Sequence, residues 1–514
     1  MIFRQRGILL LAVIAGMMAC NLPSLTTSAP PTHPPPIQEI ASPASPPSAT
    51  AAPLSYQPIF EPASCAFPVP SGYSPECGYL VVPENRARPD TRFIRLHVAI
   101  FRNRSGQPVP DPVIHLAGGP GSSSLEVARY MFEQGLDSIL DERDFILFDQ
   151  RGTGYSQPRL DCPERTSVTA TLLEISLSTE AAGQLIIDAF HRCRERLIAE
   201  GIDLSAYNSA ASAADLNDLR IALGYENLNL YAVSYGTRLA LTLMRDHPDA
   251  VRSAVLDSVY PLQVNLYTAL APNAQRAFDV FFNRCAADSF CNTAHPDLRG
   301  VFYQLVDQLN AQPVSVVIYA AGAERTVRLD GGLLIDVLFV GLYNPVVTAS
   351  MPELIYDVQQ GNYAILRERL ALYFDNSSAL GMQMAVQCAE EFPFNPVEEA
   401  DAAAQGLQPQ IAALYPNSVR PLFVVCREWT AGSPDPRENL PVLSDVPALV
   451  LAGAHDPITP PDWGRIVSND LSNTYYHEFP GNGHWVTRSS RCALEMSLAF
   501  WRDPGLDPGY SCQP

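Results

Sequence analysis

The sequence predicts an α/β fold, in which helices cover a mostly parallel sheet and a mainly helical domain is inserted between its strands. Short apolar runs alternate with helical patterns, as expected for parallel strands buried on both faces. The runs are Val113–Leu116, Phe145–Asp149, Leu228–Val233, Ala254–Leu256 and Ala448–Ala452. This alternation stops after Val259 and resumes only near Pro447. The length of 514 residues also requires more than one core, because single hydrophobic cores stop growing at roughly 250–300 residues.

These patterns divide the folded part of the chain into three segments. We expect residues 59–261 to form the first part of the sheet domain and residues 441–514 its C-terminal part. Residues 262–440 would form the inserted cap domain, where helical segments such as Ala271–Ala287 and Met351–Tyr373 dominate.

The N-terminal region predicts export from the cytoplasm. Residues 1–20 place Arg4 and Arg6 before a short apolar run, which is the pattern of a signal peptide. A small residue precedes Cys20, as in lipoprotein signals, so we expect Cys20 to be the lipidated N-terminus of an anchored protein; the alternative is an ordinary signal peptide and secretion. Residues 21–58 are rich in Pro, Ser and Thr and predict a disordered tether.

The cysteines support the same location. Ten of the eleven fall into pairs close in the sequence, and Cys20 is the one left over. Disulfides are typical of exported proteins. Proximity suggests the pairs Cys65–Cys77, Cys162–Cys193, Cys285–Cys291, Cys388–Cys426 and Cys492–Cys512. The alternative is a set of buried thiols in a cytosolic protein.

Composition excludes several classes of function. The formal charge is −20, which disfavours a nucleic-acid partner. The chain contains no Lys, so it has no phosphate-binding P-loop Lys, no pyridoxal Schiff base and no Ser-Lys dyad. No His or Cys cluster has the spacing of a metal site. We therefore expect neither a metal nor an organic cofactor.

Ser234 lies in the pattern of a nucleophile elbow. It follows a predicted strand and precedes a helical pattern, with small residues two positions before and after it, Ala232 and Gly236. Small residues are needed there because the serine sits on a sharp strand-to-helix turn. Ala232 replaces the usual glycine. Ser234 is therefore the predicted nucleophile.

A serine nucleophile needs a base and an acid that orients the base. Of nine histidines, only His484 lies on a Gly-rich loop after a strand-like stretch near the C-terminus. Asp456 follows the predicted strand before it, so the chain order Ser, Asp, His is satisfied. Asp257, at the end of an earlier strand, is the competing acid.

A glycine-rich turn follows the first predicted core strand and could form an oxyanion hole. It contains Gly118, Gly119 and Gly121. We expect the N–H of Gly119 to be one donor and the N–H of Tyr235, after the nucleophile, to be the other. The alternative is a tight turn without a catalytic role.

Four segments together resemble the tripeptidyl aminopeptidase and proline iminopeptidase family of α/β-hydrolases, over roughly residues 60 to 514. They are Gly118-Gly-Pro-Gly121, Asp149-Gln-Arg-Gly-Thr-Gly-Tyr-Ser156, Ser234-Tyr-Gly236, and Gly453-Ala-His-Asp456 with Gly483-His484. The C-terminal segment from Arg491 to Cys512 is similar to that of the secreted tripeptidyl members. The resemblance implies an α/β-hydrolase fold with an inserted cap domain.

It also implies acidic cap residues that bind the substrate α-ammonium. Glu390 best matches the family's acidic position and Glu391 is its neighbour; the alternative is a solvated acidic pair. The expected function is an extracytoplasmic serine exopeptidase that releases short N-terminal peptides. A carboxylesterase or lipase with the same triad is the alternative, and an inactive tethered binding protein is a third possibility.

Overall fold

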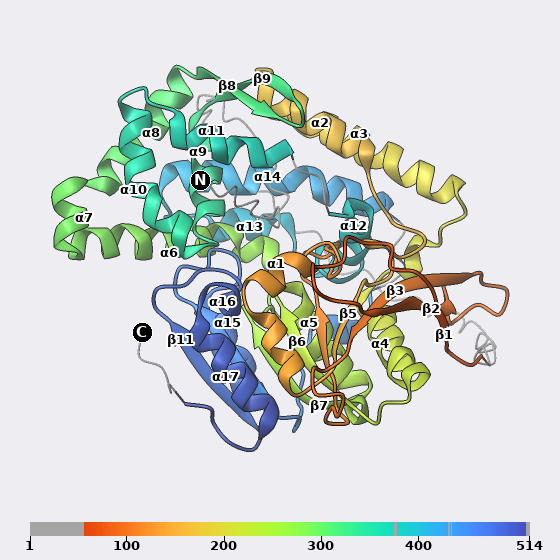
Figure 1. Cartoon of the computed structure of the whole chain (residues 1–514). Helices are drawn as coiled ribbons and strands as arrows, with labels where there is room; N and C mark the ends of the chain where they lie inside the picture. The colour runs from red at the N-terminus through yellow and green to blue at the C-terminus, as the bar shows by residue number, and fades with distance from the viewer. Residues whose placement is uncertain (1–55, 375–377, 430–431, 433, 510–514) are drawn as a thin grey trace, which may run out of the picture.

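The structure is a computed structural model that describes residues 56–374, 378–429, 432 and 434–509. Cys20, the signal peptide and nearly all of the predicted tether lie outside the described residues. Figure 1 shows a twisted sheet flanked by helices, with a second, largely helical layer above it. No helix within the described ranges is long and apolar enough to cross a membrane.

Nine strands form the central sheet in the order β1-β2-β3-β5-β4-β6-β7-β10-β11. β1, β2 and β3 are antiparallel to their neighbours in the sheet. The strands β5, β4, β6, β7, β10 and β11 follow in this order and pair in parallel. The strands are β1 (Ile59–Pro62), β2 (Glu76–Pro83), β3 (Phe93–Phe101), β4 (Val113–Leu116), β5 (Phe145–Phe148), β6 (Leu228–Val233), β7 (Val251–Asp257), β10 (Ala448–Gly453) and β11 (Thr474–Phe479). The five predicted strands form its centre, which confirms the predicted fold class.

Of the flanking strands, β1 to β3 are absent from the sequence-based prediction, whereas β11 is the strand-like stretch expected before His484. β1 to β3 and β11 lie at the two ends of the sheet, where residues need not be apolar on both faces. β11, for example, is only partly buried along most of its length. β2 and β3 are largely buried, but Arg95 and His97 interrupt the apolar run of β3.

Two helical layers cover the sheet because its strands are apolar on both faces. In β6, Leu230 and Ala232 pack with α4, α5 and α15, whereas Tyr231 and Val233 pack with α1 and α17 on the other face. These helices are α1 (Ala128–Glu133), α4 (Ser209–Leu223), α5 (Tyr235–Asp246), α15 (Pro461–Asp470) and α17 (Arg491–Arg502). The short helix α16 (Val486–Ser489) precedes α17.

The upper layer in Figure 1 has its own hydrophobic cluster. Its helices are α6 (Leu266–Ala287), α7 (Ser289–Ala294), α8 (Leu298–Ala311), α9 (Gly331–Gly341), α10 (Pro345–Gln359), α11 (Ala364–Ala371), α12 (Leu380–Glu390), α13 (Val397–Ala403) and α14 (Pro409–Glu428). A hairpin of β8 (Val314–Ala320) and β9 (Ala323–Leu329) interrupts them. The hairpin is not predicted from the sequence. Although Val316–Ala320 is a continuous apolar run, buried and exposed positions alternate along β8, unlike in the central strands.

An earlier part of the chain joins this layer. Helices α2 (Pro163–Glu174) and α3 (Thr179–Ala199) lie beside the hairpin and α14 in Figure 1. Apolar side chains from residues 160–207 belong to the same hydrophobic cluster as those from 260–429. Hydrophobic packing therefore joins residues 160–207 and 260–429 in one layer. The boundaries 59–261, 262–440 and 441–514 stay a prediction.

Short 3-10 helices complete the described chain. They are η1 (Leu136–Asp141), η2 (Leu204–Ala206), η3 (Pro248–Ala250), η4 (Leu372–Phe374), η5 (Phe392–Phe394) and η6 (Pro436–Asn439).

Four predicted disulfides are present: Cys65–Cys77, Cys162–Cys193, Cys285–Cys291 and Cys388–Cys426. The fifth predicted pair, Cys492–Cys512, includes a residue outside the described ranges. Cys388–Cys426 joins α12 to α14, and Cys162–Cys193 fixes the start of α2 to α3.

Candidate active site

Ser234 lies at the sharp turn between β6 and α5. Its backbone has φ 58° and ψ −127°, a conformation that L-residues rarely adopt and that is typical of a nucleophile elbow. A Cβ on Gly236 would lie 2.0 Å from the carbonyl oxygen of Leu116, so only glycine fits there. The start of α5 therefore lies directly against the end of β4.

His484 and Asp456 are in direct contact. Their loops follow the neighbouring parallel strands β11 and β10, whose carboxyl ends lie at one edge of the sheet. The Nδ1 atom of His484 donates to Oδ2 of Asp456 over 2.8 Å, and both residues are buried. With its proton on Nδ1, the imidazole keeps Nε2 free to act as a base.

Asp456 is held as a carboxylate by several donors. Its Oδ1 accepts the N–H groups of Ile458 at 3.0 Å and Thr459 at 2.9 Å, and its Oδ2 accepts the Thr459 hydroxyl at 2.6 Å. Burial raises the pKa of Asp456, but His484 and the hydrogen bonds from Thr459 outweigh it and keep the pKa below its ordinary value. The acid therefore stays ionised beside the imidazole.

Glycines allow the His484 loop to approach its neighbours closely. A Cβ on Gly483 would lie 1.9 Å from the carbonyl oxygen of Leu342 in the upper layer. A Cβ on Gly453 would lie 2.0 Å from the carbonyl oxygen of Gly483. The loop is thus packed between the end of α9 and the Asp456 loop.

Asp257, the competing acid, contacts the segment after His484. Its carboxylate accepts the N–H groups of Val486 and Thr487, each at 2.8 Å, and the Thr487 hydroxyl at 2.6 Å. Asp257 thereby fixes the start of α16. Of the two candidate acids, Asp456 is the one paired with His484.

The glycine-rich turn after β4 lies against the serine. A Cβ on Gly118 would lie 2.8 Å from the Cβ of Ser234 and 3.4 Å from its Oγ. Gly119 has φ 109°, which L side chains disfavour. Tyr235 is the first residue of α5, so its N–H has no acceptor within that helix. The two predicted oxyanion donors therefore belong to segments that meet at Ser234.

Asp149 is hydrogen-bonded to the residues that follow the glycine-rich turn. Its carboxylate accepts the Ser123 hydroxyl at 2.7 Å and the backbone N–H groups of Leu125 and Tyr155. Burial raises the pKa of Asp149 to about 7, although these hydrogen bonds oppose the rise. Asp149 therefore joins the glycine-rich turn to its own loop.

Glu390 and Glu391 are buried beside Arg238 of α5. Glu390 accepts the backbone N–H and the hydroxyl of Ser209, and its Oε2 lies 3.2 Å from Nε of Arg238. The Oε1 of Glu391 lies 2.9 Å from Nη1 of the same guanidinium. Burial raises the pKa of Glu391 and Arg238 opposes the rise. Neither residue is solvated, and both carboxylates already have a cationic partner.

Three residues near the acid and base were not predicted from the sequence. Thr459 bonds Asp456 and lies 3.1 Å from Nδ1 of His484. Arg276 of α6 donates to the backbone carbonyls of Ala454 and Asp456. The Tyr343 ring lies 4.8 Å from the His484 ring. Thr459 follows Asp456 by three residues and was detectable as a turn residue, whereas Arg276 and Tyr343 come from distant segments.

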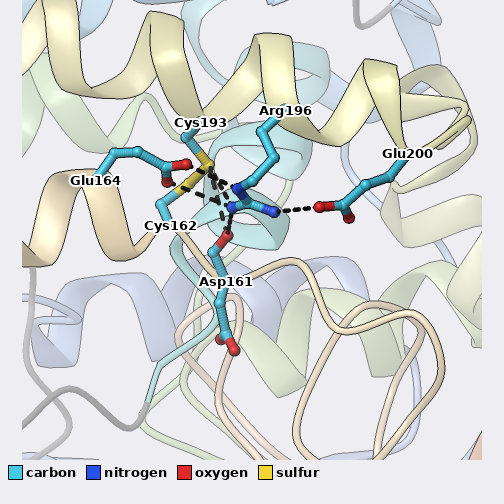
Figure 2. Close-up of a disulfide and its surroundings, with 6 residues drawn as sticks. All are labelled: Asp161, Cys162, Glu164, Cys193, Arg196 and Glu200. Atoms are coloured by element: carbon cyan, nitrogen blue, oxygen red, sulfur yellow. Dashed lines mark hydrogen bonds and ion pairs between the residues drawn. A yellow bond between two sulfur atoms is a disulfide. The ribbon is translucent and has the colours of Figure 1, made fainter.

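Within the part of the chain that the structure describes, one side-chain cluster has the proximity of a metal site. Cys162, Glu164 and Cys193 lie together, but the two cysteines form a disulfide and offer no thiolate. Figure 2 shows that Glu164 instead binds Arg196 and that Arg196 also binds the carbonyl of Asp161. Nε of Arg196 lies 2.7 Å from the Glu164 carboxylate. The cluster stabilises the junction of α2 and α3.

The family described as alpha/beta hydrolase fold matches residues 111–487, well over half of the chain. The chain belongs to this family. Serine protease Hip1 of Mycobacterium tuberculosis is 25% identical over 467 residues, which cover 85% of this chain and 87% of that protein. The tripeptidyl aminopeptidase of Streptomyces lividans is 33% identical over 191 residues, 36% of this chain and 35% of that protein.

A probable proline iminopeptidase of Streptomyces coelicolor is 28% identical over 160 residues, covering 31% of this chain and 36% of that protein. The three relatives carry peptidase names. They confirm the resemblance identified from the sequence motifs and the expectation of an enzyme related to serine peptidases.

Proposed function

We propose that the chain is an extracytoplasmic serine exopeptidase that releases short peptides from the free N-terminus of its substrates. The observation that carries the proposal is the Asp456–His484 pair, whose loops follow β10 and β11 of the sheet that also carries the Ser234 elbow and its glycine-rich turn. The tripeptidyl aminopeptidase and iminopeptidase relatives support peptides with a free amine as the substrate class.

The mechanism is acyl transfer. Nε2 of His484 accepts the Ser234 proton as Oγ attacks the scissile carbonyl, and Asp456 stabilises the imidazolium. The N–H groups of Gly119 and Tyr235 bind the oxyanion, where the loss of one donor typically costs about 2.7–4 kcal/mol. The imidazolium protonates the leaving amine, and water then hydrolyses the acyl-enzyme.

Fluorogenic tripeptides with free and acetylated N-termini test this function. Wild type should cleave the free peptide far faster, and Ser234→Ala should lose the activity on both. Equal cleavage of both peptides by wild type would identify an esterase-like or endopeptidase-like hydrolase. Activity that survives in Ser234→Ala would show that Ser234 is not the nucleophile of the reaction.

The location is proposed on separate grounds. Four disulfides in the described chain support folding in an oxidising compartment. We propose a membrane anchor through lipidated Cys20, which lies outside the described residues. Mass spectrometry of the mature N-terminus tests it, because cleavage before Cys20 with an added lipid mass is expected, and Cys20→Ala should abolish both.

A further inference from the structure

The residue that follows the base, Trp485, has an unusual backbone conformation. Its φ is 64° and its ψ is 72°, in the left-handed region that residues other than glycine rarely adopt. Such a conformation persists only where the surrounding structure fixes it, and it is most common at functional sites. Trp485 is buried and joins His484 to the short helix α16. The contacts of Trp485 therefore determine the direction in which the chain leaves the base.

The backbone of Trp485 is bound by the residue after Asp257. Its N–H donates to Oγ of Ser258 over 2.8 Å, and the Ser258 hydroxyl donates in turn to Oδ1 of Asp257 over 3.0 Å. Ser258 also has a positive φ, 61°, and its N–H donates to the carbonyl of Leu451 in β10 over 2.9 Å. Ser258 is thereby fixed to the strand that leads to Asp456.

The indole of Trp485 reaches the same carboxylate by a second path. Its Nε1–H donates to the Tyr231 hydroxyl over 2.7 Å, and the Tyr231 hydroxyl lies 2.5 Å from that of Thr487. The Thr487 hydroxyl donates to Oδ2 of Asp257 over 2.6 Å. Because an indole only donates and a carboxylate only accepts, Tyr231 must donate to Thr487. The result is a closed ring of hydrogen bonds, the Asp257 ring, which contains Trp485, Ser258, Asp257, Thr487 and Tyr231.

The Asp257 ring is buried, and its indole packs against two other aromatic groups. All five members are at most 4% exposed. The Trp485 ring stacks on His115 of β4, with centroids 6.2 Å apart, and meets the Tyr130 ring of α1 edge-on at 6.3 Å. Breaking a buried hydrogen bond leaves a polar group without water to replace its partner. Packing and hydrogen bonds therefore hold the indole in one orientation.

The Asp257 ring begins directly after the base. On one side of Trp485, His484 donates to Asp456, and on the other side the N–H of Val486 donates to Oδ1 of Asp257 over 2.8 Å. Asp456 lies on the loop after β10 and Asp257 at the end of β7, and these strands are neighbours in the sheet. The left-handed turn at Trp485 allows His484 and Val486 to bind two different carboxylates.

Resting on the proposed role of His484 as the base, we propose that Trp485 is a positioning residue for the reaction. Its indole, bound to Tyr231 in the Asp257 ring, fixes the turn that keeps the imidazole of His484 on Asp456. Tyr231 lies in β6, the strand that leads to Ser234, so the ring also fixes the His484 loop relative to the nucleophile. A displacement of about 1 Å can cost about 100-fold in rate. Trp485 acts through His484 and needs no contact with the substrate.

The test compares Trp485→Phe with Trp501→Phe. The Trp501 ring of α17 is also buried and lies 6.0 Å from the Tyr231 ring, but its Nε1 has no hydrogen-bond partner among the described residues. The same substitution therefore removes a similar volume of core at both positions, and it removes a hydrogen bond only at Trp485. Tyr231→Phe breaks that hydrogen bond from its other side and removes only a hydroxyl. The Tm of each variant verifies that it folds.

Trp485→Phe should lower kcat by about 10- to 100-fold with little change in KM, on fluorogenic peptides and on a p-nitrophenyl ester alike. It should slow the reaction of Ser234 with a fluorophosphonate by a similar factor, because that reaction also needs the base. Tyr231→Phe should show a smaller loss of the same kind. The double variant should lose little more than Trp485→Phe, because both changes break one hydrogen bond. Trp501→Phe should keep the wild-type kcat, although its Tm should also fall.

Equal losses of kcat in Trp485→Phe and Trp501→Phe would overturn the assignment, because core packing would then explain both. An unchanged kcat in Trp485→Phe, or a loss confined to KM, would also overturn it. If Trp485→Phe does not fold, an unchanged kcat in Tyr231→Phe has the same meaning.

The same measurements separate this assignment from the proposed function. If wild type reacts with the fluorophosphonate but cleaves free and acetylated peptides equally, the exopeptidase function fails, and the two tryptophan variants still decide the role of Trp485. If Ser234 of wild type does not react at all, the proposed function and the role of Trp485 fail together.

Discussion

The carboxylate of Asp257 accepts the backbone N–H of Thr487 over 2.8 Å and its hydroxyl over 2.6 Å, three residues beyond His484. Asp257 ends β7, the strand between that of Ser234 and that of Asp456. A carboxylate at this position resembles a catalytic acid in sequence. Here its hydrogen bonds hold the segment that follows the base, whereas Asp456 orients the base.

Asp257→Asn and Asp456→Asn should therefore differ. Asp456→Asn should lower kcat by about 10⁴-fold, because an amide cannot hold the required imidazole tautomer. Asp257→Asn leaves one buried N–H without its acceptor and should lower the free energy of unfolding by about 1–3 kcal/mol. Steady-state kinetics and denaturant unfolding of both variants check this. A 10⁴-fold loss in Asp257→Asn with normal activity in Asp456→Asn would reverse the two roles.

Thr459 should act as a positioning residue for Asp456. Its hydroxyl and N–H both bind the carboxylate, so Thr459→Val removes one hydrogen bond and keeps the shape. We expect kcat to fall about tenfold with little change in KM, and Thr459→Ser to restore most of the activity, because a hydroxyl bond to a charged group contributes about 1.5–3 kcal/mol. Equal losses in the valine and serine variants would contradict a role of the hydroxyl.

Arg238 should contribute strongly to the stability of the fold. Its guanidinium is 1% exposed and pairs with Glu390 and Glu391. Arg238→Met leaves two buried carboxylates without their cation and should lower the free energy of unfolding by about 3–5 kcal/mol. The triple variant with Glu390→Gln and Glu391→Gln should recover part of that stability. Urea unfolding measures the stability of wild type, Arg238→Met and the triple variant. An Arg238→Met protein as stable as wild type would show that the pairing is dispensable.

His115 should make the stability fall in mild acid. It is buried beside Ser124 and stacks on Trp485, and burial lowers its pKa to about 3 from the ordinary 6.5. Between these values the unfolded chain binds more protons at this residue, so its contribution is complete above pH 6.5 and declines as the pH falls. His115→Gln should show a weaker decline in the free energy of unfolding between pH 7 and pH 4. Parallel decline in both proteins would exclude His115 as a source.

The sequence by itself determined the central strands, the glycines around Ser234 and the loops that carry Asp456 and His484. These follow from local rules, because burial on both faces requires apolar runs and sharp turns require small residues. The four disulfides present were also predictable, since their cysteines are close in sequence.

Only the tertiary structure decided which distant groups meet. Asp257 ends β7 and Asp456 lies on the loop after β10, and strand order and loop course brought Asp456 to His484. Arg238 and the two glutamates are more than one hundred and fifty positions apart, with Arg238 and Glu390 separated by 152. Tyr343 follows the end of α9, and only the packing of this segment against the Gly483 loop places its ring beside the base. The periodicity of apolar residues predicts which face of a helix or strand is buried, whereas the segment that packs on that face depends on how the whole chain folds.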